Sequence, residues 1–428
     1  MILSHYHTVT DLGDNRLALY SFVTGRLHVT TEAVYKQLKD GNMENIDSSI
    51  IGELKCSRIL LDSAEEDIVK SFESEKLRLI ILPTGECNLR CIYCGLQKDG
   101  MGKISTRTMD HIVLFTEERL AEKHYKGIQV DWFGGEPTLQ IPEIRNLTHR
   151  LLSVAERHAL PYTSRIVTNG ILLNEENTKI LVEECKVSFV EVTIDGSAAY
   201  NDARRKNADG KGFYHKIIHN VEQLLCNFNN ITFSIRCNVD RTNVDGIFPL
   251  LEDMQRRGIQ NKCKFYIAMI HSWGSENGNL ALPVEEFAEL QYDVLEYMHS
   301  HGFNVTKDDI LPFSPRKRDC TAVIKSAYVI DHHGLIFSCT ETPYTGDITS
   351  VIGHVRKRGE LLQRRVYDIP HEILSECIPC PVYPICGGGC RKRCLEHGHQ
   401  ECIPLKFNIS KRVKFVLEIN KFETKELI

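Results

Sequence analysis

From residue 77 onward, short apolar runs alternate with longer stretches that carry apolar residues at helical spacing. The runs have the length of buried strands, and the stretches between them have the period of amphipathic helices. The expected strands are 77–82, 128–133, 164–168, 189–194, 232–238 and 264–269. The expected helices are 106–124, 142–158, 175–184, 213–228, 244–257 and 283–301. Strands that alternate with helices predict a parallel sheet, so we expect an α/β fold of six strand–helix units.

Residues 1–75 show a different order of elements, with strands first and helices afterwards. Strands are expected at 5–12, 17–23 and 26–30, and Gly13-Asp14-Asn15 provides a turn between the first two. Helices are expected at 31–38 and 48–54. This order predicts a small α+β domain ahead of the main sheet.

Polar or glycine-rich residues follow each of the first five expected strands. In parallel α/β sheets, the carboxyl ends of the strands meet at one edge, where functional groups gather. We therefore expect one pocket that is built from several loops. In strand order, its candidates are residues 87–94, then Gly134, Gly135, Glu136 and Pro137, then Thr168 and Asn169, then Thr193 and Asp195, then Arg236 and Asn238.

Length and composition exclude several classes of protein. A chain of 428 residues is too long for one ordinary domain, and 42% hydrophobic with 25% charged residues is typical of a soluble globular protein. A net charge of −5 leaves no basic excess to neutralise phosphates, so nucleic acid is not expected as a partner. No apolar run approaches the length of a membrane span, and residues 1–7 lack the basic start and apolar core of a signal peptide. We expect a cytoplasmic protein without a membrane partner.

Sixteen cysteines are a high count, and their distribution is uneven. Three lie at 87–94 and eight lie between Cys320 and Cys402. In a cytosolic chain, cysteines in such groups are more often metal ligands or catalytic residues than disulfides.

The first group, Cys87, Cys91 and Cys94, has C-x3-C-x2-C spacing. A [4Fe–4S] cluster normally has four cysteine ligands, so three thiolates at this spacing would leave one iron for a ligand that is not protein. The alternatives are a zinc site or unpaired core thiols. Zinc usually takes a closed tetrahedral set of ligands, and no histidine or fourth cysteine lies nearby.

This loop resembles the signature of the radical S-adenosylmethionine (SAM) superfamily, in which an aromatic residue precedes the last cysteine, as Tyr93 does here. The resemblance implies that Cys87, Cys91 and Cys94 hold three irons and that SAM binds the fourth through its amino and carboxylate groups. It also implies a 5′-deoxyadenosyl radical that removes a hydrogen atom from the substrate. The fold that it implies is a partial (β/α)6 TIM-like barrel.

Other strand ends resemble further motifs of this superfamily. Gly134-Gly135-Glu136-Pro137 is similar to its GGE motif, which implies that this backbone and Glu136 meet the amino group of SAM. Thr168-Asn169-Gly170 and Thr193-Ile194-Asp195-Gly196 are similar to its TNG and S-x-D-G strand ends. The resemblance makes Thr193 a candidate for the carboxylate or ribose of SAM, whereas Asp195 is either a SAM contact or a residue that holds its own loop.

Two arginines extend this set. Arg236 and Asn238 are two residues apart on a strand and therefore point to the same face, where the SAM carboxylate is one candidate partner for the arginine. Residues 201–205 resemble the H-D-x-x-R motif of the superfamily with Asn201 in place of histidine. We expect Arg205 to pair with Asp202 or Asp195 and to support the site.

The C-terminal cysteines match the spacing of the SPASM pattern, C-x(9–15)-G-x4-C followed by C-x2-C-x5-C-x3-C and a last cysteine. A zinc-ribbon-like module is the alternative. The resemblance implies two auxiliary clusters of the [4Fe–4S] type. The outer one would be held by Cys377, Cys380, Cys386 and Cys402, and the inner one by Cys320, Cys339 and Cys390. Residues 316–319 offer no fourth inner ligand, and Cys394 is either that ligand or a substitute for Cys402.

These resemblances divide the chain into four parts: 1–75, a barrel at 76–310, a SPASM domain at 311–410 and a helical tail at 411–428. The order of elements in 1–75 resembles a RiPP recognition element, a module that binds the leader of a ribosomally synthesised precursor peptide as an added strand. The alternative is a cap that stabilises the barrel.

Enzymes that combine these domains modify peptides or proteins, so the resemblance implies a peptide maturase that installs a thioether or carbon–carbon cross-link. An external low-potential electron donor, such as flavodoxin or ferredoxin, would be its partner. The alternative is a sulfatase-maturating enzyme, in which an aspartate that acts as base directly follows the cysteine equivalent to Cys339. Here Thr340 and Glu341 follow instead. An alternative from another class is an iron–sulfur electron carrier or redox sensor, which would need no SAM-binding loops.

Overall fold

The computed structural model describes residues 1–63, 75–95, 102–271, 280–311, 320–341, 351–357, 375–419 and 425–427. The chain divides into two compact units. The first unit contains Met1–Ser71, Pro283–Arg318 and Tyr367–Ile428, and the second contains Phe72–Leu282 and Asp319–Val366. The domain boundaries expected at 75, 310 and 410 remain predictions. The two compact units do not test them, because each unit combines segments that are distant in sequence.

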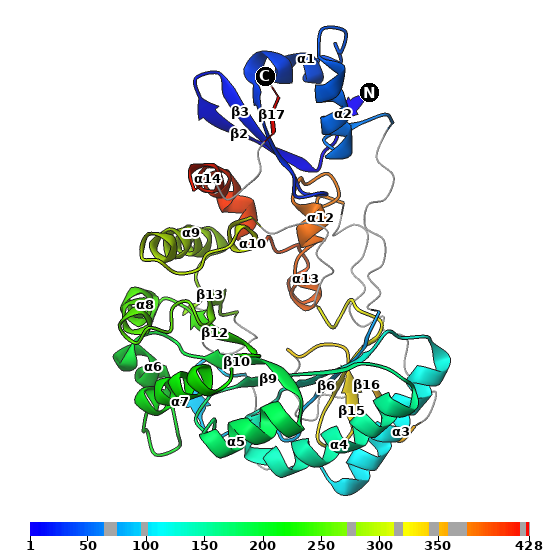
Figure 1. The fold of residues 1–428 in the computed structure, drawn as a ribbon, viewed down its shortest axis with the longest axis vertical. Helices are drawn as coiled ribbons and strands as arrows, with labels where there is room; N and C mark the ends of the chain where they lie inside the picture. The colour runs from blue at the N-terminus through cyan, green and yellow to red at the C-terminus, as the bar shows by residue number, and fades with distance from the viewer. Residues whose placement is uncertain are drawn as a thin grey trace. The chain divides into compact units, whose positions relative to one another are not determined.

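The second unit is built on a nine-stranded sheet in the order β13-β12-β10-β9-β8-β6-β14-β15-β16 (Figure 1). The six strands that the apolar runs predict are all present, parallel and adjacent in chain order, so the parallel α/β prediction is confirmed. They are β6 (Leu77–Ile81), β8 (Ile128–Trp132), β9 (Tyr162–Thr168), β10 (Val187–Thr193), β12 (Thr232–Val239) and β13 (Lys264–Met269).

Amphipathic helices connect these strands. Side chains cap the N-termini of two of these helices. The Ser105 hydroxyl accepts a hydrogen bond from the Thr108 amide at 3.0 Å, and the Asn174 side chain accepts one from the Asn177 amide at 2.8 Å. The connecting helices are α3 (Thr106–Glu122), α4 (Ile141–Arg157), α5 (Glu175–Lys179) with a π-helical turn (Ile180–Glu184), α7 (Tyr214–Asn227) and α8 (Ile247–Arg256). The helix expected at 283–301 is α9 (Val284–Ser300), but it packs against α14 (Leu405–Glu418) in the first unit.

The two faces of this sheet differ in polarity. Cross-strand neighbours on one face form an apolar row that is almost fully buried: Ile81, Trp132, Ile166, Val190 and Phe233. The opposite face carries an ion pair between Arg78 and Asp131, with Nε–Oδ2 at 2.6 Å, and a hydrogen bond of 2.8 Å from the Tyr266 hydroxyl to Glu191. Because parallel sheets are usually apolar on both faces, this polarity indicates a face that lines a ligand site.

A seventh parallel strand comes from the cysteine-rich part of the chain. β14 (Ala327–Ile330) pairs with β6, and β15 (Leu335–Phe337) and β16 (Val351–His354) continue the sheet in antiparallel fashion. Ala327, Val329 and Phe337 share a core with Ile80 and Leu82 of the barrel. The structure therefore places residues 320–341 in the same unit as the barrel, although the sequence assigned them to a separate C-terminal domain.

The first unit contains a small four-stranded sheet in the order β17-β4-β3-β2. The strands and helices expected in residues 1–75 are confirmed: β2 (His7–Gly13), β3 (Arg16–Ser21), β4 (Leu27–Thr31), α1 (Glu32–Lys39) and α2 (Ser48–Cys56). A separate short pair joins β1 (Ile2–Leu3) and β5 (Leu60–Leu61). Further elements of this unit are α10 (Lys307–Ile310), α12 (Tyr383–Cys386) and α13 (Arg391–His397).

The C-terminal tail, predicted to be helical over 411–428, is helical as far as Glu418 at the end of α14. The strand β17 (Lys425–Leu427), which the prediction does not include, then pairs in parallel with β4. A strand of three residues has no periodicity that the sequence can reveal, and its partner lies almost 400 residues earlier in the chain. In the described part of the chain, no helix has the length and apolar character needed to cross a membrane.

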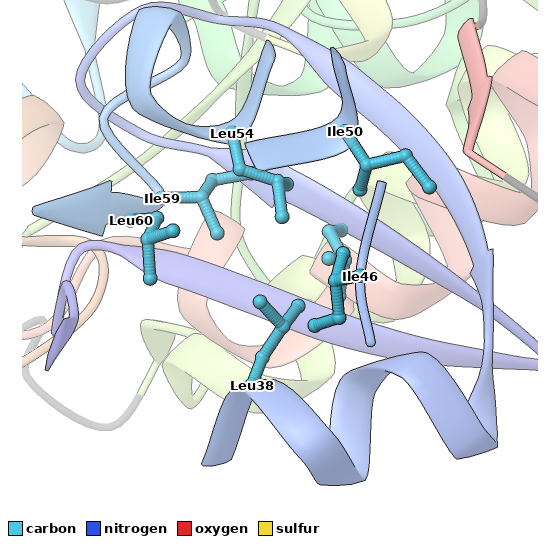
Figure 2. Close-up of a cluster of buried hydrophobic side chains, with 7 residues drawn as sticks. Leu38, Ile46, Ile50, Leu54, Ile59 and Leu60 are labelled. Carbon is cyan, nitrogen blue, oxygen red and sulfur yellow. The ribbon is translucent and has the colours of Figure 1, made fainter. Parts of the chain in front are cut away.

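The core of this N-terminal fold is formed by leucine and isoleucine side chains between the sheet and the two helices (Figure 2). Leu19 of β3 packs with Leu38 of α1 and with Ile50 and Leu54 of α2. Leu54 is fully buried, whereas Ile51 on the same helix packs at the margin of this core.

We expect Leu54→Ala to destabilise the N-terminal fold by about 2–5 kcal/mol, because it removes buried methyl groups and leaves a cavity. Ile51→Ala, the matched control, should cost clearly less. Limited proteolysis measures the difference, since cleavage within residues 1–63 follows the population of the opened form. Equal protease resistance of the two variants would contradict this core assignment.

Candidate functional site

The cysteine loop follows β6 and is fixed by backbone pairing at its far end. Within it, β7 (Arg90–Cys91) pairs with β11 (Arg205–Lys206), so that Cys91 lies opposite Arg205. The Cys94 amide donates to the Cys91 carbonyl at 3.2 Å and closes a turn between these two cysteines. Cys87, Cys91 and Cys94 are all half-buried, and therefore lie at the surface of the fold rather than in a packed core.

The sulfur of Cys87 has nitrogen donors around it. The Leu89 amide donates to Sγ at 3.4 Å, and Nδ2 of Asn169 lies at 4.0 Å from it. The same Nδ2 donates to Oδ1 of Asn88 at 2.7 Å. N–H groups directed at a cysteine sulfur stabilise its thiolate form, which is the form that ligates iron. Asn169, a predicted cofactor residue from the end of β9, therefore lies beside the first cysteine.

The glycines after β8 pack directly on the backbone that precedes Cys87. A Cβ atom added to Gly135 would lie 2.2 Å from the carbonyl oxygen of Glu86, and one added to Gly134 would lie 2.7 Å from that of Thr84. Gly134 also has a φ of +119°, a conformation that side chains disfavour. Only glycine therefore allows the two loops to approach this closely.

Glu136 is buried and joins the ends of β8 and β9. Its Oε1 accepts hydrogen bonds from the amide and hydroxyl of Thr138 and from the Thr168 hydroxyl, and its Oε2 accepts the Asn169 amide at 2.7 Å. Burial raises the pKa of Glu136, and these donors oppose that effect. The carboxylate thus holds Thr168 and Asn169 in place, and Oε2 has the capacity for one further donor. Pro137 begins the 3₁₀ turn that follows.

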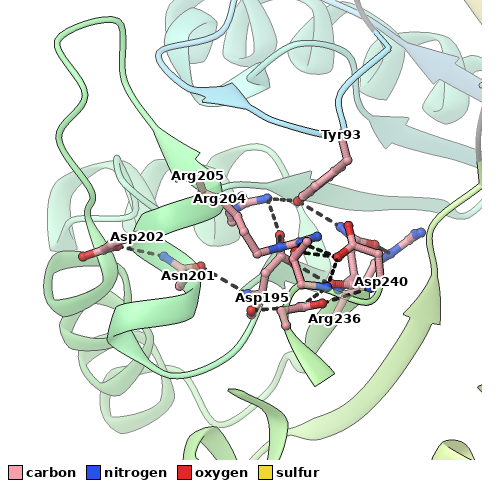
Figure 3. A network of polar contacts seen from close by, with 11 residues as sticks. Tyr93, Asp195, Asn201, Asp202, Arg204, Arg205, Arg236 and Asp240 are labelled. Atoms are coloured by element: carbon pink, nitrogen blue, oxygen red, sulfur yellow. Dashed lines mark hydrogen bonds and ion pairs between the residues drawn. The ribbon is translucent and has the colours of Figure 1, made fainter. Parts of the chain in front are cut away.

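Tyr93 links the cysteine loop to β11 and to the end of β12 (Figure 3). Its hydroxyl receives hydrogen bonds from Arg205 at 2.6 Å and from Nδ2 of Asn238 at 3.2 Å, and the Arg204 guanidinium lies 5.1 Å from its ring. Burial raises the pKa of Tyr93, so the phenol stays neutral and remains a hydrogen-bonding partner. Tyr93 and Asn238, two residues of the pocket expected from the sequence, therefore help to fix the loop.

Asp195 is fully buried in the same network. Its Oδ1 accepts the Asn238 amide at 2.9 Å, and its Oδ2 lies 3.8 Å from Arg205 and 3.9 Å from Arg204 (Figure 3). Of the two partners considered for Arg205, the structure brings Asp195 close, whereas Asp202 accepts the amides of residues 213 and 214. This geometry gives Asp195 a role in the fold of its own loop.

Arg236 lies on the polar face of the sheet, beside Thr193 of β10. Its Nε donates to Oδ1 of Asn238 at 2.8 Å, and its guanidinium lies 4.0 Å from Glu191. Burial alone would lower the pKa of Arg236, but Tyr266, Glu191 and Glu341 raise it through their charges. Glu341, which follows Cys339 by two residues, therefore acts on the same part of the pocket as Arg236.

A second cysteine site lies in the first unit. Cys377, Cys380, Cys386 and Cys402 line one pocket with a volume of about 100 Å³. The pKa of Cys377 is raised to about 11, mainly because the thiol is buried and also because other thiols lie close to it. Thiols this crowded become thiolates only where a metal centre shares their charge, so the donor set fits an iron–sulfur cluster. Across the described residues, no three Cys, His, Asp or Glu side chains are grouped as ligands of a single metal ion.

The loop that carries this pocket requires glycine as well. Gly387, Gly388 and Gly389 all have positive φ, and a Cβ at Gly389 would lie 2.1 Å from the Glu401 carbonyl oxygen. Cys394 is buried, and its thiol donates to the Gly388 carbonyl at 3.2 Å. It therefore supports the glycine loop behind the pocket.

Comparison with known proteins identifies one domain of the chain. Residues 81–236 match the model of the radical SAM superfamily, a range that begins before Cys87 and ends at Arg236. This part of the chain is a radical SAM domain. The cysteine loop fits the [4Fe–4S] cluster of this superfamily, because three half-buried thiols, an N–H donor to sulfur and a glycine cradle come together there.

Relatives of this radical SAM protein include two sulfatase maturases. It is 23% identical over 350 residues to the cysteine-type anaerobic sulfatase-maturating enzyme of Clostridium novyi (strain NT), which covers 74% of this chain and 88% of that protein. It is 28% identical over 158 residues to the serine-type enzyme of Bacteroides thetaiotaomicron, with coverage of 35% and 37%. The solved structure described as native anSMEcpe with bound AdoMet has a TM-score of 0.60 at 19% identity, and the match covers 80% of this chain and 99% of that one. This structural likeness shows a shared fold.

Several residues of this site carry no motif that the sequence reveals. The apolar runs predict only strands at Glu191 and Tyr266, although a glutamate within an apolar run is a signal for a polar pocket face. Arg204 was not assigned a role, yet it pairs with Asp240 at 2.7 Å beneath Tyr93. Of the predicted inner ligands, Cys320 and Cys339 belong to the barrel unit and Cys390 to the other unit, so that set remains a prediction.

We expect Gly135→Ala to prevent the cysteine loop from holding its cluster, because the new Cβ would displace the Glu86 backbone just before Cys87. Gly95→Ala is the matched control: it adjoins Cys94, and its Cβ would meet no atom within 4 Å. Iron content and the visible absorption of the reconstituted protein measure the effect. Full iron content in Gly135→Ala would show that the contact between the two loops is not required.

Proposed function

We propose that this radical SAM enzyme installs a thioether or carbon–carbon cross-link in a ribosomally synthesised precursor peptide. The proposal includes three iron–sulfur clusters and SAM as cofactors, and a low-potential donor such as flavodoxin or ferredoxin as electron source. The observation that carries it is the combination of a radical SAM loop, a separate four-cysteine pocket and a small N-terminal sheet that already accepts an additional strand at its edge.

The residues of the pocket would have different roles in binding the cluster and SAM. Cys87, Cys91 and Cys94 would hold the radical-generating cluster, and Tyr93 would keep their loop against β11 and the end of β12. Gly134 and Gly135 let backbone groups approach a bound ligand, and Oε2 of Glu136 offers an acceptor for an ammonium group. When bound, the cluster and SAM supply a 5′-deoxyadenosyl radical that removes a hydrogen atom from the substrate.

The polar face of the sheet would orient the substrate beside this loop. Arg236, Glu191 and Tyr266 form a connected group in which donors and acceptors are both present, and Glu341 adds a second carboxylate. Such a group suits the polar backbone of a peptide better than an apolar metabolite. The pocket of Cys377, Cys380, Cys386 and Cys402 is the candidate site of an auxiliary cluster, which would supply an electron acceptor when bound.

A second candidate function is sulfatase maturation, in which a cysteine or serine of a sulfatase becomes formylglycine. It is supported by the names of two relatives, the sulfatase-maturating enzymes of Clostridium novyi and Bacteroides thetaiotaomicron, and by the electrostatic effect of Glu341 on Arg236. The residue directly after Cys339 is threonine rather than aspartate, which favours the cross-linking proposal. Both candidates modify a polypeptide and share the same radical chemistry.

Cleavage of SAM tests the enzyme class. The protein is reconstituted anaerobically and supplied with SAM and a strong reductant, and 5′-deoxyadenosine and methionine are measured by mass spectrometry. We expect both products from the natural protein and only background from Cys91→Ala, which should still retain iron in its C-terminal clusters. Failure of the fully reconstituted natural protein to form 5′-deoxyadenosine would favour an electron carrier or redox sensor.

Glu341→Gln separates the two candidate reactions. If Glu341 serves as the base of sulfatase maturation, its removal should lower formylglycine formation on a sulfatase-derived peptide by about a hundredfold, since general bases contribute at least that much. Under the cross-linking proposal, the natural protein forms no formylglycine. A co-expressed precursor peptide instead loses two hydrogen atoms, measured by mass spectrometry. Glu118→Gln on the helical side of the barrel is the control for charge alone.

A further inference from the structure

The chain's own C-terminal strand occupies one edge of the N-terminal sheet. Lys425, Glu426 and Leu427 of β17 lie opposite His28, Val29 and Thr30 of β4 in parallel register. These three pairs include the middle of β4, which consists of only five residues. Without β17, β4 would be an edge strand with unpaired backbone groups, and such edges readily accept another extended segment.

The other positions around this sheet are less suited to an incoming strand. β2, the opposite edge, has a register shift between Asp11 and Gly13, and the residues that follow, Asp14 and Asn15, have left-handed backbone conformations. Bulges and twisted ends of this kind protect an edge from further pairing. One face of the sheet packs on α1 and α2 through Leu19, and α14 contacts β2. The β4 edge therefore remains as the place where an extended peptide can pair.

The pairing of β17 with β4 has the features of a reversible contact. It comprises three residue pairs, and it is parallel. Parallel pairs are slightly less stable per residue than antiparallel ones, and an edge strand of this length has little stability of its own. What favours it is that β17 belongs to the same chain, which gives it an effective concentration of about millimolar order at this edge.

We propose that β17 is a displaceable strand that occupies the β4 edge until an extended segment of the peptide substrate replaces it. The inference rests on the proposed function, since it assumes a polypeptide substrate. Pairing through backbone groups would tolerate many side chains in the incoming segment but would exclude proline at bonded positions. The β4 edge thereby becomes a regulated docking site, at which binding of substrate requires release of the C-terminal tail.

The test compares the natural chain with a chain that ends at Thr424. The probe is a fluorescent synthetic peptide with the sequence of residues 421–428, KFETKELI. If β17 occupies the edge nine-tenths of the time, the truncated chain should bind this probe about tenfold more tightly than the natural chain. Hydrogen exchange of the backbone amides in residues 27–31 should also become faster on truncation and slow again when the probe is added.

Two point variants guard against an indirect effect of truncation. Glu426→Pro removes a backbone donor and restricts the strand, and it should behave like the truncated chain. Glu426→Gln keeps the strand backbone and should behave like the natural chain. Equal binding of the probe to all four proteins, or faster exchange at residues 27–31 without binding of the probe to the truncated chain, would overturn the proposal.

The outcome is independent of the chemistry of the barrel. Cleavage of SAM to 5′-deoxyadenosine is measured on the same four proteins without any peptide, and it should be equal in all of them. If SAM cleavage fails everywhere while the probe binds as expected, the proposed reaction is wrong and the docking edge stands. If SAM is cleaved and the probe shows no difference, only the role of β17 is wrong.

Discussion

The contact between two loops, at the ends of β6 and β8, is the constraint on which the candidate site depends. Gly134 and Gly135 lie so close to the carbonyl oxygens of Thr84 and Glu86 that no side chain fits between them. The contact sets the direction in which the backbone enters the cysteine loop. It also places the buried carboxylate of Glu136 where it can hold the end of β9. The ends of β6, β8 and β9 are thereby joined on one side of the site.

A buried network of charged residues also holds the cysteine loop in place, through Tyr93. Arg204 and Arg205 lie between Tyr93, Asp195 and Asp240, almost entirely removed from water. Removing one partner of such a network typically costs about 3–5 kcal/mol, because the remaining charge is left buried without compensation. The network therefore tolerates few alternative positions of the cysteine loop. Residues that resemble cofactor contacts in sequence serve here to keep the loop in place.

The first unit follows another principle, in which segments from both ends of the chain complete one another. α14 contacts β2, and β17 pairs with β4, so the last residues of the chain complete a sheet made by the first. The four-cysteine pocket lies in the same unit and is likewise assembled from residues 377–402 through a glycine loop. A cluster bound there would add its binding energy to the stability of this unit. Peptide docking, as proposed, would exchange one strand of the sheet for another.

The sequence by itself determined the six parallel strands, the cysteine loop and the glycine motif, because hydrophobic period and ligand spacing are local properties of the chain. It also identified the four cysteines that line the C-terminal pocket. Tertiary structure alone decided that β14 joins the barrel sheet, that α9 packs with α14, and that β17 closes the N-terminal sheet. It likewise decided that Tyr93, Asn238 and Asp195 bind one another. These are pairings between residues far apart in sequence, and no local pattern encodes which partner a short strand or a buried polar group will find.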